Sequence, residues 1–252
     1  MKTAIIIPCY NEALRIDVSR YIDFIATHPL YHLCLVNDGS EDTTLEILNT
    51  IQNACSKRVT VIHLEKNKGK AAAIRTAAKY LYHQDAIRYI GYMDADLSTD
   101  FIDYKRLTQC LKQNDNLSLV FGSRKTNGFN NIIKRGNKRK FFSMVIKSII
   151  NLILGLEISD TQCGAKVFKK EEIPLIYGKA FVSKWLFDVE IFLRLKKRYG
   201  KEIVMQKIKE EPLLKWIGVE GSKITISDSV QIPVRLLNIW VTYSVMNTFD
   251  IR

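Results

Sequence analysis

Short apolar runs alternate with longer amphipathic segments through the first half of the chain. The runs are almost continuously apolar, which is typical of parallel strands that are covered on both faces. They predict strands at residues 4–7, 33–36, 59–64, 89–93 and 117–121. The segments between them predict helices at 15–26, 42–54, 70–83 and 100–113. We therefore expect an α/β fold with a mostly parallel, Rossmann-like sheet and helices on both faces.

The second half of the chain has a less regular pattern. Residues 139–158 are strongly apolar with helical spacing, and a second helix is expected at 186–200, ended by Gly200. The last helix is expected at 227–249, with Pro233 near its start. Residues 164–170 and 202–208 predict strands. Because no linker rich in Gly, Pro or Ser divides the chain, we expect a single domain.

Polar, glycine-bearing stretches follow each of the five strands expected in the first half. They are PCYNE, NDGSEDTT, EKNKGK, DADLS and GSRK, in chain order. The carboxyl ends of parallel strands meet at one edge of an open α/β sheet, and ligands bind at that edge. We therefore expect these five stretches to build one site.

Composition excludes several classes of protein. With 252 residues, of which 47% are hydrophobic, the chain can bury a full core, which argues against disorder. The five cysteines show no CxxC pair and no metal-ligand spacing, so neither a disulfide framework nor a zinc site is predicted. A reducing cytoplasm fits this pattern. The four-residue apolar run before Pro8 is too short for a secretion signal.

The chain is strongly basic, with 38 Lys and Arg against 26 Asp and Glu and a formal net charge of +12. This balance favours an anionic partner: nucleic acid, a phosphorylated ligand or an acidic membrane surface. A solvated basic surface that aids solubility is the alternative. No RNA- or DNA-binding signature accompanies the charge, so a basic nucleic-acid-binding module is the least favoured hypothesis.

Asp94 and Asp96 follow the strand expected at 89–93. Residues i and i+2 of an extended segment point the same way, and Ala95 between them is small enough to let a ligand approach. Two carboxylates on one side can hold a hard divalent cation, with water and phosphate oxygens completing its ligands. The alternative is an ordinary turn at a strand end, beside a helix cap at Asp100.

Two further stretches also allow two interpretations. Asp38 fits a turn, with Ser40 or Asp42 as the cap of the next helix, or it accepts hydrogen bonds from a nucleotide base or ribose. Gly69 and Lys70 open a helix whose free N–H groups favour an anion, or they simply start a helix with an alanine packing face. Their spacing does not match a P-loop, which disfavours a Walker-type ATPase.

Taken together and in this order, the stretches IIIPCYNE, VNDGSEDTT, NKGKAAAIRTA and DADLS resemble the inverting GT-A glycosyltransferases of family two. DTQCGAKVFKK at 160–170 and WLFDVEIFLRLKK at 185–197 are similar to the polyprenyl-phosphate glycosyltransferases, especially the dolichyl-phosphate glucosyltransferase branch. The resemblance covers about the first 200 residues. It implies a GT-A catalytic domain over 1–252, with a nucleotide-sugar-binding half at 1–125, an acceptor half at 126–226 and a C-terminal helical segment at 227–252.

The resemblance also implies roles for individual residues. Nucleotide-sugar contacts are implied for Pro8, Tyr10, Asn11, Glu12, Asp38, Lys70, Asp94, Ala95 and Asp96. Mg²⁺ or Mn²⁺ is implied on Asp94 and Asp96. Contacts with the acceptor phosphate are implied for Arg124 and Arg139, and the sugar and acceptor side is implied for Asp160, Gln162, Asp188 and Glu190. Ser98 stands where the mannosyl branch often has Gln as a metal ligand, which favours a UDP-sugar over GDP-mannose.

The expected reaction moves a hexose, glucose from UDP-glucose, onto a polyprenyl phosphate with inversion at the anomeric carbon. A phosphate acceptor has a second pKa of about 6, so it is mostly ionised at neutral pH and needs no strong base. The alternative acceptor is a sugar hydroxyl of a growing surface glycan, which needs a base, and Asp188 is the candidate. An exposed polar helix face is the other interpretation of Asp188 and Glu190. Function is favoured for Asp188, and the two interpretations are even for Glu190.

The apolar helix expected at 139–156 is too interrupted to cross a membrane. Lys147 and Asn151 break its apolar run before the roughly 20 residues that a spanning helix needs. Together with the basic stretch KRGNKRK at 134–140, it fits either a membrane interface or a core helix packed on the sheet. We expect a cytoplasmic protein with a peripheral contact at the inner face of the cytoplasmic membrane.

Overall fold

The computed structural model describes residues 2–124, 137–216 and 226–249, without the side chains of 137–144, 226–230 and 245–249. The strands are β1 (Lys2–Cys9), β2 (Tyr31–Asp38), β3 (Val59–Leu64), β4 (Ile87–Tyr92), β5 (Leu119–Ser123), β6 (Lys166–Lys169) and β7 (Ile208–Pro212). The helices are α1 (Val18–Thr27), α2 (Thr44–Ala54), α3 (Lys70–Tyr82), α4 (Phe101–Gln113), α5 (Asn137–Leu154), the 3₁₀ turn η1 (Lys170–Glu172), α6 (Ile173–Tyr177), α7 (Phe187–Tyr199), α8 (Lys201–Lys207) and α9 (Ile226–Phe249).

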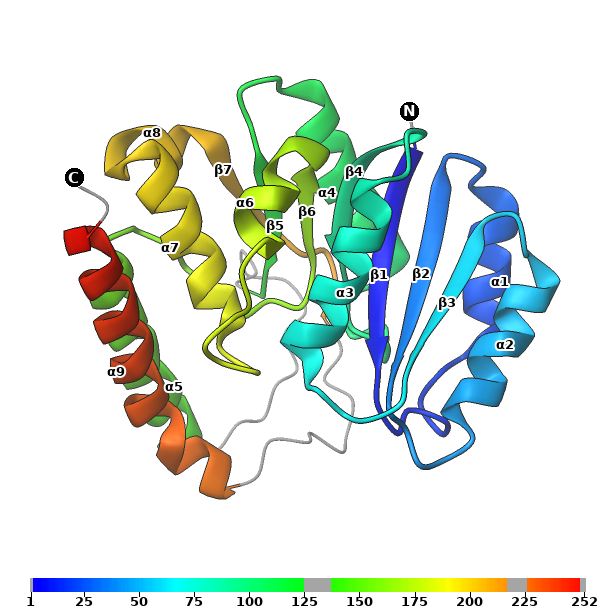
Figure 1. Cartoon of the computed structure of the whole chain (residues 1–252), viewed down its shortest axis with the longest axis horizontal. Helices are drawn as coiled ribbons and strands as arrows, with labels where there is room; N and C mark the ends of the chain where they lie inside the picture. Colours follow the sequence, from blue (N-terminus) through cyan, green and yellow to red (C-terminus); the bar gives the residue numbers. More distant parts are fainter. Residues whose placement is uncertain (1, 125–136, 217–225, 250–252) are drawn as a thin grey trace.

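These strands form one sheet in the order β3-β2-β1-β4-β6-β5-β7 (Figure 1). β6 runs antiparallel to its neighbours β4 and β5, and the other pairs are parallel. The predicted mostly parallel α/β fold is therefore confirmed. β6 comes from the second half of the chain but lies between β4 and β5 of the first half. Segments far apart in sequence therefore meet where these strands end.

The strands and helices predicted for the first half all form, with bounds displaced by a few residues. The strand predicted at 202–208 is wrong, because Lys201–Lys207 forms α8 and β7 begins only at Ile208. Gly200, with a φ of 79°, ends α7 and leads directly into this second helix. Val204 packs inward while the apolar residues on either side of it are exposed, which the linear pattern could not indicate.

The side chains of β1 alternate between two hydrophobic cores, one on each face of the sheet. Ala4 and Ile6 pack with α3, α6 and α7, whereas Ile5 and Ile7 pack with α1, α2 and α4. This follows from the two-residue period of a strand, and it explains the continuous apolar run in the sequence.

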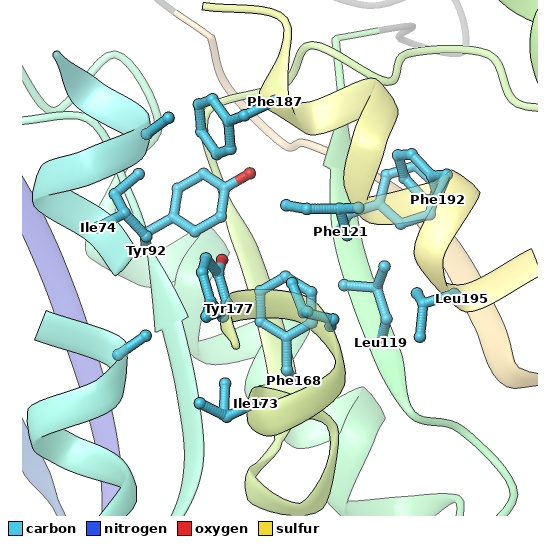
Figure 2. Packing of buried hydrophobic residues seen from close by; sticks show 14 of the residues in the cluster. Ile74, Tyr92, Leu119, Phe121, Phe168, Ile173, Tyr177, Phe187, Phe192 and Leu195 are labelled. Carbon is cyan, nitrogen blue, oxygen red and sulfur yellow. The ribbon is translucent and has the colours of Figure 1, made fainter. Parts of the chain in front are cut away.

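Aromatic side chains fill the core between β4, β5, β6 and α7 (Figure 2). The ring of Tyr92 lies near the rings of Phe168 and Phe187, with centroid distances of 6.3 and 5.7 Å. Phe121 of β5 meets Phe192 of α7 edge to face at 5.0 Å. These contacts fix the first turns of α7 over the sheet, close to the carboxyl end of β4.

Helices α5 and α9 lie side by side at one end of the molecule, next to α7 (Figure 1). Ile150 and Leu154 of α5 and Leu236 and Ile239 of α9 join the core on this face of the sheet. The helix predicted at 227–249 is confirmed. Across the described ranges, no helix is both long and apolar enough to cross a membrane.

Candidate active site

Five of the residues predicted to form the site gather at the carboxyl edge of the sheet. Asp38 is the last residue of β2, Asp94 and Asp96 follow β4, and Arg124 follows β5. Lys70 opens α3. The arrangement expected from the five polar stretches is therefore present, and its parts come from strands that are far apart in sequence.

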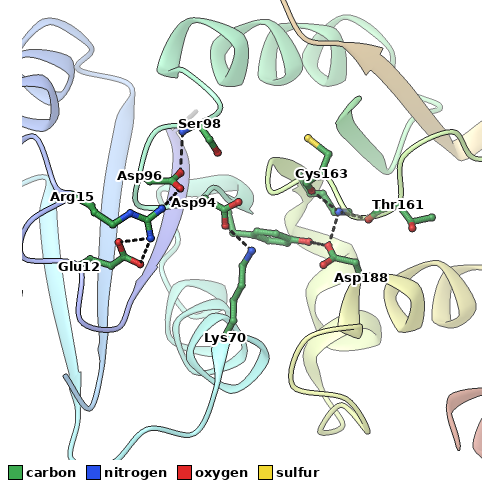
Figure 3. Close-up of polar contacts among 11 residues, drawn as sticks. Glu12, Arg15, Lys70, Asp94, Asp96, Ser98, Thr161, Cys163 and Asp188 are labelled. Atoms are coloured by element: carbon green, nitrogen blue, oxygen red, sulfur yellow. Dashed lines mark hydrogen bonds and ion pairs between the residues drawn. The ribbon is translucent and has the colours of Figure 1, made fainter. Parts of the chain in front are cut away.

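Asp94 and Asp96 each contact a cation (Figure 3). Lys70 Nζ lies 2.6 Å from Asp94 Oδ1, and Arg15 Nη2 lies 2.5 Å from Asp96 Oδ2. Burial on its own would lower the pKa of Lys70, but the carboxylates of Asp94 and Asp188 outweigh it and raise that pKa. Lys70 is therefore a cation at neutral pH, and it balances part of the acidic charge at the strand end.

The backbone after the two aspartates is held in an uncommon conformation. Leu97 has a φ of 51°, a region that branched residues rarely adopt. The N–H of Ser98 donates to Asp96 Oδ1 at 3.0 Å. Asp100 caps α4 by accepting a hydrogen bond from the N–H of Ile102 at 2.8 Å, so the predicted cap is confirmed. This tight turn fixes the orientation of the Asp96 carboxylate.

The chemistry of the aspartate pair fits a divalent cation shared with a ligand. The side chains of Asp94 and Asp96 are 35% and 16% exposed, so both carboxylates border solvent. In the part of the chain that the structure describes, no group of three or more His, Cys, Asp or Glu side chains could hold a metal ion. Mg²⁺ commonly binds through one or two carboxylates and takes its other ligands from water and substrate phosphates.

Gly164 lies directly against the Asp94 carboxylate. A Cβ added at Gly164 would stand 1.8 Å from Asp94 Oδ2, far inside van der Waals contact. The buried Ala95 is likewise too small to crowd its two acidic neighbours. Close approach of the 160–164 segment to the aspartates thus depends on the absence of a side chain.

Asp38 has a structural contact that agrees with the turn interpretation. Its buried carboxylate accepts hydrogen bonds from the N–H groups of Lys68 at 2.9 Å and Gly69 at 2.8 Å. Burial raises the pKa of Asp38, although the two N–H groups act in the opposite direction. Asp38 thereby holds the loop that leads into α3. A contact with a nucleotide stays a prediction.

The segment after β1 is tied to the segment after β2. Asn11, with a φ of 48°, donates its N–H to Ser40 Oγ at 3.0 Å. The carboxylate of the buried Glu12 lies 3.2 Å from Arg15 Nη1. Pro8 and Tyr10 are half-buried at the same edge. These residues lie next to Asp38 and Asp96 in the sheet order, as the prediction of a nucleotide site requires.

Arg124 and Asp160 form a forked ion pair. Nε and Nη2 of Arg124 each donate to the carboxylate at 2.7 Å, and the N–H of Arg124 adds a third hydrogen bond at 3.0 Å. Burial would raise the pKa of Asp160, but Arg124 outweighs burial and lowers it. Gln162, two residues after Asp160, is half-buried, and its amide donates to Thr161 Oγ1 at 3.5 Å. Arg139 belongs to α5, and its side chain lies outside the described residues.

Lys166 of β6 is fully buried and holds Asp188 in place, a contact that the sequence pattern did not indicate. Its Nζ donates to Asp188 Oδ1 at 2.5 Å and to the carbonyls of Thr161 and Cys163 at 2.9 Å (Figure 3). These three bonds use all the protons of the ammonium group. The hydroxyl of Tyr92 donates to the same oxygen of Asp188. Asp188 is therefore buried and oriented, so the interpretation as an exposed polar face is wrong.

Glu190 is also buried, but its contacts lie away from the acidic strand ends. Its carboxylate accepts hydrogen bonds from the N–H groups of Val182 at 3.0 Å and Ser183 at 2.8 Å. A third comes from the hydroxyl of Tyr243 in α9 at 2.9 Å. Glu190 thus anchors the segment that precedes α7 and ties it to α9, and it does not lie on an exposed face.

The buried lysine left one signal in the sequence that could have been used. Lys166 stands within the apolar run GAKVF, and a lysine inside a covered strand needs a carboxylate partner. The sequence could not predict which carboxylate this is, because Asp188 lies 22 positions away on helix α7. Arg15 and Tyr92 gave no comparable signal.

The open, mostly parallel sheet with the acidic pair at its carboxyl edge agrees with the GT-A class of glycosyltransferase that the sequence predicted. The family model described as Glycosyl transferase family 2 matches residues 4–173. The chain therefore belongs to glycosyl transferase family 2.

Curated relatives extend the similarity over almost the whole chain. A dolichyl-phosphate beta-glucosyltransferase of Dictyostelium discoideum is 26% identical over 253 residues, which cover 95% of this chain and 74% of that protein. One from Trichomonas vaginalis is 29% identical over 262 residues, covering 98% and 75%.

A solved structure supports the same fold. Glucosyl-3-phosphoglycerate synthase from Mycobacterium tuberculosis, solved with Mn²⁺, UDP-glucose and phosphoglyceric acid, matches with a TM-score of 0.69 at 15% identity. The match covers 95% of this chain and 80% of that one. At this level of identity, the likeness shows the fold alone.

Proposed function

We propose that this protein transfers glucose from UDP-glucose to a polyprenyl phosphate with inversion at the anomeric carbon. One observation carries the proposal: a chain with Asp94 and Asp96 at the sheet edge aligns over 95% of its length with a dolichyl-phosphate beta-glucosyltransferase. The transferred sugar and the lipid-phosphate acceptor follow from the name of that relative. The UDP donor follows from the resemblance described above, in which Ser98 favours a UDP-sugar.

Asp94 and Asp96 are the residues that would hold Mg²⁺ or Mn²⁺ on the donor diphosphate. Such an ion supplies Lewis-acid stabilisation of the nucleoside diphosphate as it leaves. Lys70 lies 2.6 Å from Asp94 and adds positive charge on the same side. Pro8, Tyr10 and Asp38 border the place where the base and ribose would lie.

The surroundings of Asp188 favour a phosphate acceptor over a sugar hydroxyl. Lys166 and Tyr92 both donate to Oδ1 of Asp188. Two donors on one oxygen suit a carboxylate that orients neighbouring groups better than one that takes up a proton. A phosphate acceptor is mostly ionised at neutral pH, with a second pKa of about 6, so it attacks without a strong base.

The outer face of α5 and α9 supports a peripheral membrane contact. Exposed apolar side chains gather on these two neighbouring helices: Val145, Leu152, Val234, Leu237, Trp240 and Val241. Apolar side chains on the outside of a basic chain favour insertion into an anionic membrane surface. A lipid acceptor would be reached there, at the inner face of the cytoplasmic membrane.

Release of UDP from UDP-glucose by the purified protein tests the proposal. We expect release that requires both added polyprenyl phosphate and Mg²⁺ or Mn²⁺. The Asp96→Ala variant should lower transfer by about a hundredfold or more, because stabilisation by a metal ion amounts to several kcal/mol. Asp100→Asn keeps a good helix cap and serves as the matched control. Full activity of Asp96→Ala would rule out the metal role.

The Asp188→Asn variant distinguishes the two acceptor classes. With a phosphate acceptor, we expect transfer to fall but to stay measurable, because no general base is lost. With a sugar hydroxyl acceptor, the same change should abolish transfer. Complete loss in Asp188→Asn, with donor binding and folding intact, would favour the glycan acceptor.

A further inference from the structure

Arg15 lies between two carboxylates at the carboxyl edge of the sheet (Figure 3). Its Nη2 lies 2.5 Å from Asp96 Oδ2, and its Nη1 lies 3.2 Å from Glu12 Oε2. The N–H of Arg15 also donates to the carbonyl of Glu12 at 2.9 Å, which fixes the start of its side chain. Arg15 therefore occupies one side of a carboxylate to which the proposed function assigns a divalent cation.

Charge, more than hydrogen bonding, accounts for the position of the Arg15 guanidinium. Its Nε is buried and donates to no acceptor among the residues that the structure describes. A buried donor without an acceptor is unfavourable, so the attraction of two carboxylates has to outweigh this cost. On Asp96 the second oxygen, Oδ1, accepts from the N–H of Ser98 at 3.0 Å. Both oxygens of this carboxylate thus already contact a donor.

Cations nearly balance the carboxylates around the aspartate pair. Lys70 Nζ lies 2.6 Å from Asp94 Oδ1, so each aspartate of the pair has a cation of its own. The ion pairs that the structure describes in this cluster join four cations to five carboxylates: Arg15 to Glu12 and Asp96, Lys70 to Asp94, Arg124 to Asp160, and Lys166 to Asp188. The carboxylates of the cluster therefore exceed its cations by a single charge.

This balance gives a divalent cation and a nucleotide opposite affinities for the same place. A lone Mg²⁺ or Mn²⁺ meets two carboxylates whose charge is largely offset by Arg15 and Lys70, so little attraction remains. A nucleoside diphosphate is anionic, and the same two cations attract it. Once the diphosphate is bound, its oxygens supply both negative charge and further ligands for the ion.

The charge of Arg15 also separates Asp96 from a third carboxylate. Without that charge, Glu12 and Asp96 would lose the cation that they share. Glu12, Asp94 and Asp96 would then add their negative charges at one edge of the sheet. The affinity of a site with oxygen ligands for a divalent cation increases with the charge of its ligands. A neutral residue at position 15 should therefore strengthen the binding of a divalent cation that arrives alone.

We propose that Arg15 keeps the aspartate pair from binding a divalent cation in the absence of nucleotide, so that the ion binds together with the donor diphosphate. Arg15 acts on the ion through Asp96 and on the nucleotide through its positive charge. The inference rests on the proposed function, since it concerns the ion and the donor of that reaction.

Separate binding of Mn²⁺ and of UDP tests the role of Arg15 without requiring turnover. The variants Arg15→Gln and Arg15→Met remove the charge, and Arg15→Lys keeps it. Arg20→Gln is the matched control, because Arg20 forms a similar ion pair with the helix cap Asp100 at 2.7 Å. Bound Mn²⁺ is measured from the loss of the EPR signal of the free ion, and UDP binding is measured by calorimetry in EDTA. Thermal melting confirms that each variant is folded.

The two neutral variants should change the two affinities in opposite directions. We expect the Kd for Mn²⁺ alone to fall about tenfold or more, because a full positive charge next to the ion is removed. The Kd for UDP in EDTA should rise at least about threefold, because a charge that attracts the nucleotide is lost. Arg15→Lys and Arg20→Gln should resemble the wild type in both measurements. General damage to the site would instead weaken both affinities.

Three results would overturn the inference. One is a Kd for Mn²⁺ alone that is unchanged or raised in both neutral variants, since Arg15 would then only orient Asp96. Another is a Kd for Mn²⁺ that falls as far in Arg15→Lys as in the neutral variants, which would assign the effect to side-chain shape. The third is an unchanged Kd for UDP in both neutral variants.

Failure of the proposed function gives a different pattern. If both affinities change as expected but the wild-type protein transfers no glucose to a polyprenyl phosphate, the role of Arg15 holds and the proposed reaction fails. If the wild-type protein transfers glucose and the neutral variants bind Mn²⁺ no more tightly than it does, the reaction holds and the role of Arg15 fails.

Discussion

Single residues at the carboxyl edge show how closely the acidic groups are fitted to their surroundings. Asp94 is fixed on one oxygen by Lys70 and packed on the other against Gly164. Since the second contact is steric, a change as small as one methyl group would displace the carboxylate. The position of this aspartate thus depends on a glycine from the second half of the chain.

The Gly164→Ala variant should lose donor binding. Its Cβ would stand 1.8 Å from Asp94 Oδ2, so the carboxylate must move. We expect transfer to fall at least about tenfold, because a displacement of about 1 Å in a catalytic site has effects of this order or larger. The stabilisation of the protein by UDP-glucose and Mn²⁺ in thermal melting is the measurement.

Gly200→Ala is the matched control for this change. Gly200 has a φ of 79° and a ψ of 165°, and no neighbour lies within 4 Å of an added Cβ, so only backbone strain of about 1–3 kcal/mol is expected. The control should melt earlier but bind donor normally. Normal donor binding by Gly164→Ala would show that the Asp94 position is not set by this contact.

The Arg124–Asp160 pair predicts a specific dependence of stability on pH. Because Arg124 holds the pKa of Asp160 below its usual value, the pair stabilises the fold above the unfolded pKa of about 3.9. This contribution is lost as the pH falls through the lower folded pKa. Asp160→Asn should cost about 1–3 kcal/mol at pH 7, and this difference should shrink below about pH 4.

Urea unfolding of wild type and Asp160→Asn between pH 7 and pH 3 is the measurement. The exposed Asp23→Asn should show no comparable difference at any pH in this range. A difference between wild type and Asp160→Asn that stays constant down to pH 3 would contradict the sign argued from Arg124.

For the ion pairs of Asp96 and Asp188, the acidic half was predictable from sequence, whereas the cationic half was not. Asp94 and Asp96 stand in a short motif directly after an apolar strand, so a local pattern is enough to place them. Arg15 lies 81 positions from Asp96, and Lys166 lies 22 positions from Asp188. Such pairs form through sheet order, and the antiparallel insertion of β6 between β4 and β5 had no local sequence signal.

At the level of helices and strands, the first turns of α7 connect the active site to α9. Asp188 faces β4 and β6, while Glu190, two residues later, faces the 182–183 segment and Tyr243. One helix start therefore holds both Asp188 of the candidate site and the contact of the 182–183 segment with α9. The hydroxyl of Tyr243 also accepts a hydrogen bond from Arg194 Nε at 2.8 Å, which closes this network.

Removing the Tyr243 hydroxyl should loosen α9. Tyr243→Phe leaves Glu190 and Arg194 each without one hydrogen bond, which should cost about 1–3 kcal/mol. Denaturant unfolding measures the total, and hydrogen exchange should show loss of protection in α9 ahead of β1 and β2. Tyr80→Phe, at an exposed position of α3, is the control. Uniform loss of protection across the sheet would contradict a local role.

The helices and strands of the first half could be predicted from the sequence, because each strand is apolar throughout and each helix is long enough to show its hydrophobic period. The 202–208 segment is too short to show such a period. Three consecutive apolar residues, Ile203, Val204 and Met205, fit a strand equally well, and only packing of α8 on α7 selects the helix. Short segments carry too few residues for periodicity to decide.

For the molecule as a whole, the two ends of the sheet present different side chains. The β1–β3 end, covered by α1 and α2, carries the predicted nucleotide residues (Figure 1). The α5 and α9 end presents exposed apolar side chains. A lipid acceptor would approach from the second end and a water-soluble donor from the first, so the acidic strand ends between them are where the two substrates would meet.

This arrangement predicts that membrane association and catalysis can be separated. In α9, Val234 and Leu237 are 60% and 55% exposed, and burying such side chains in a membrane contributes about 1 kcal/mol each. The double variant Val234→Ser and Leu237→Ser should weaken binding to anionic vesicles by about tenfold or more in a sedimentation assay.

Leu30→Ser, at a 53% exposed position before β2, removes a similar side chain from the other end and should bind vesicles normally. UDP-glucose binding should be the same in all three proteins, because neither change reaches the acidic strand ends. Vesicle binding that the α9 double variant leaves unchanged would show that α9 does not face the membrane, and the acceptor would then have to enter by another side.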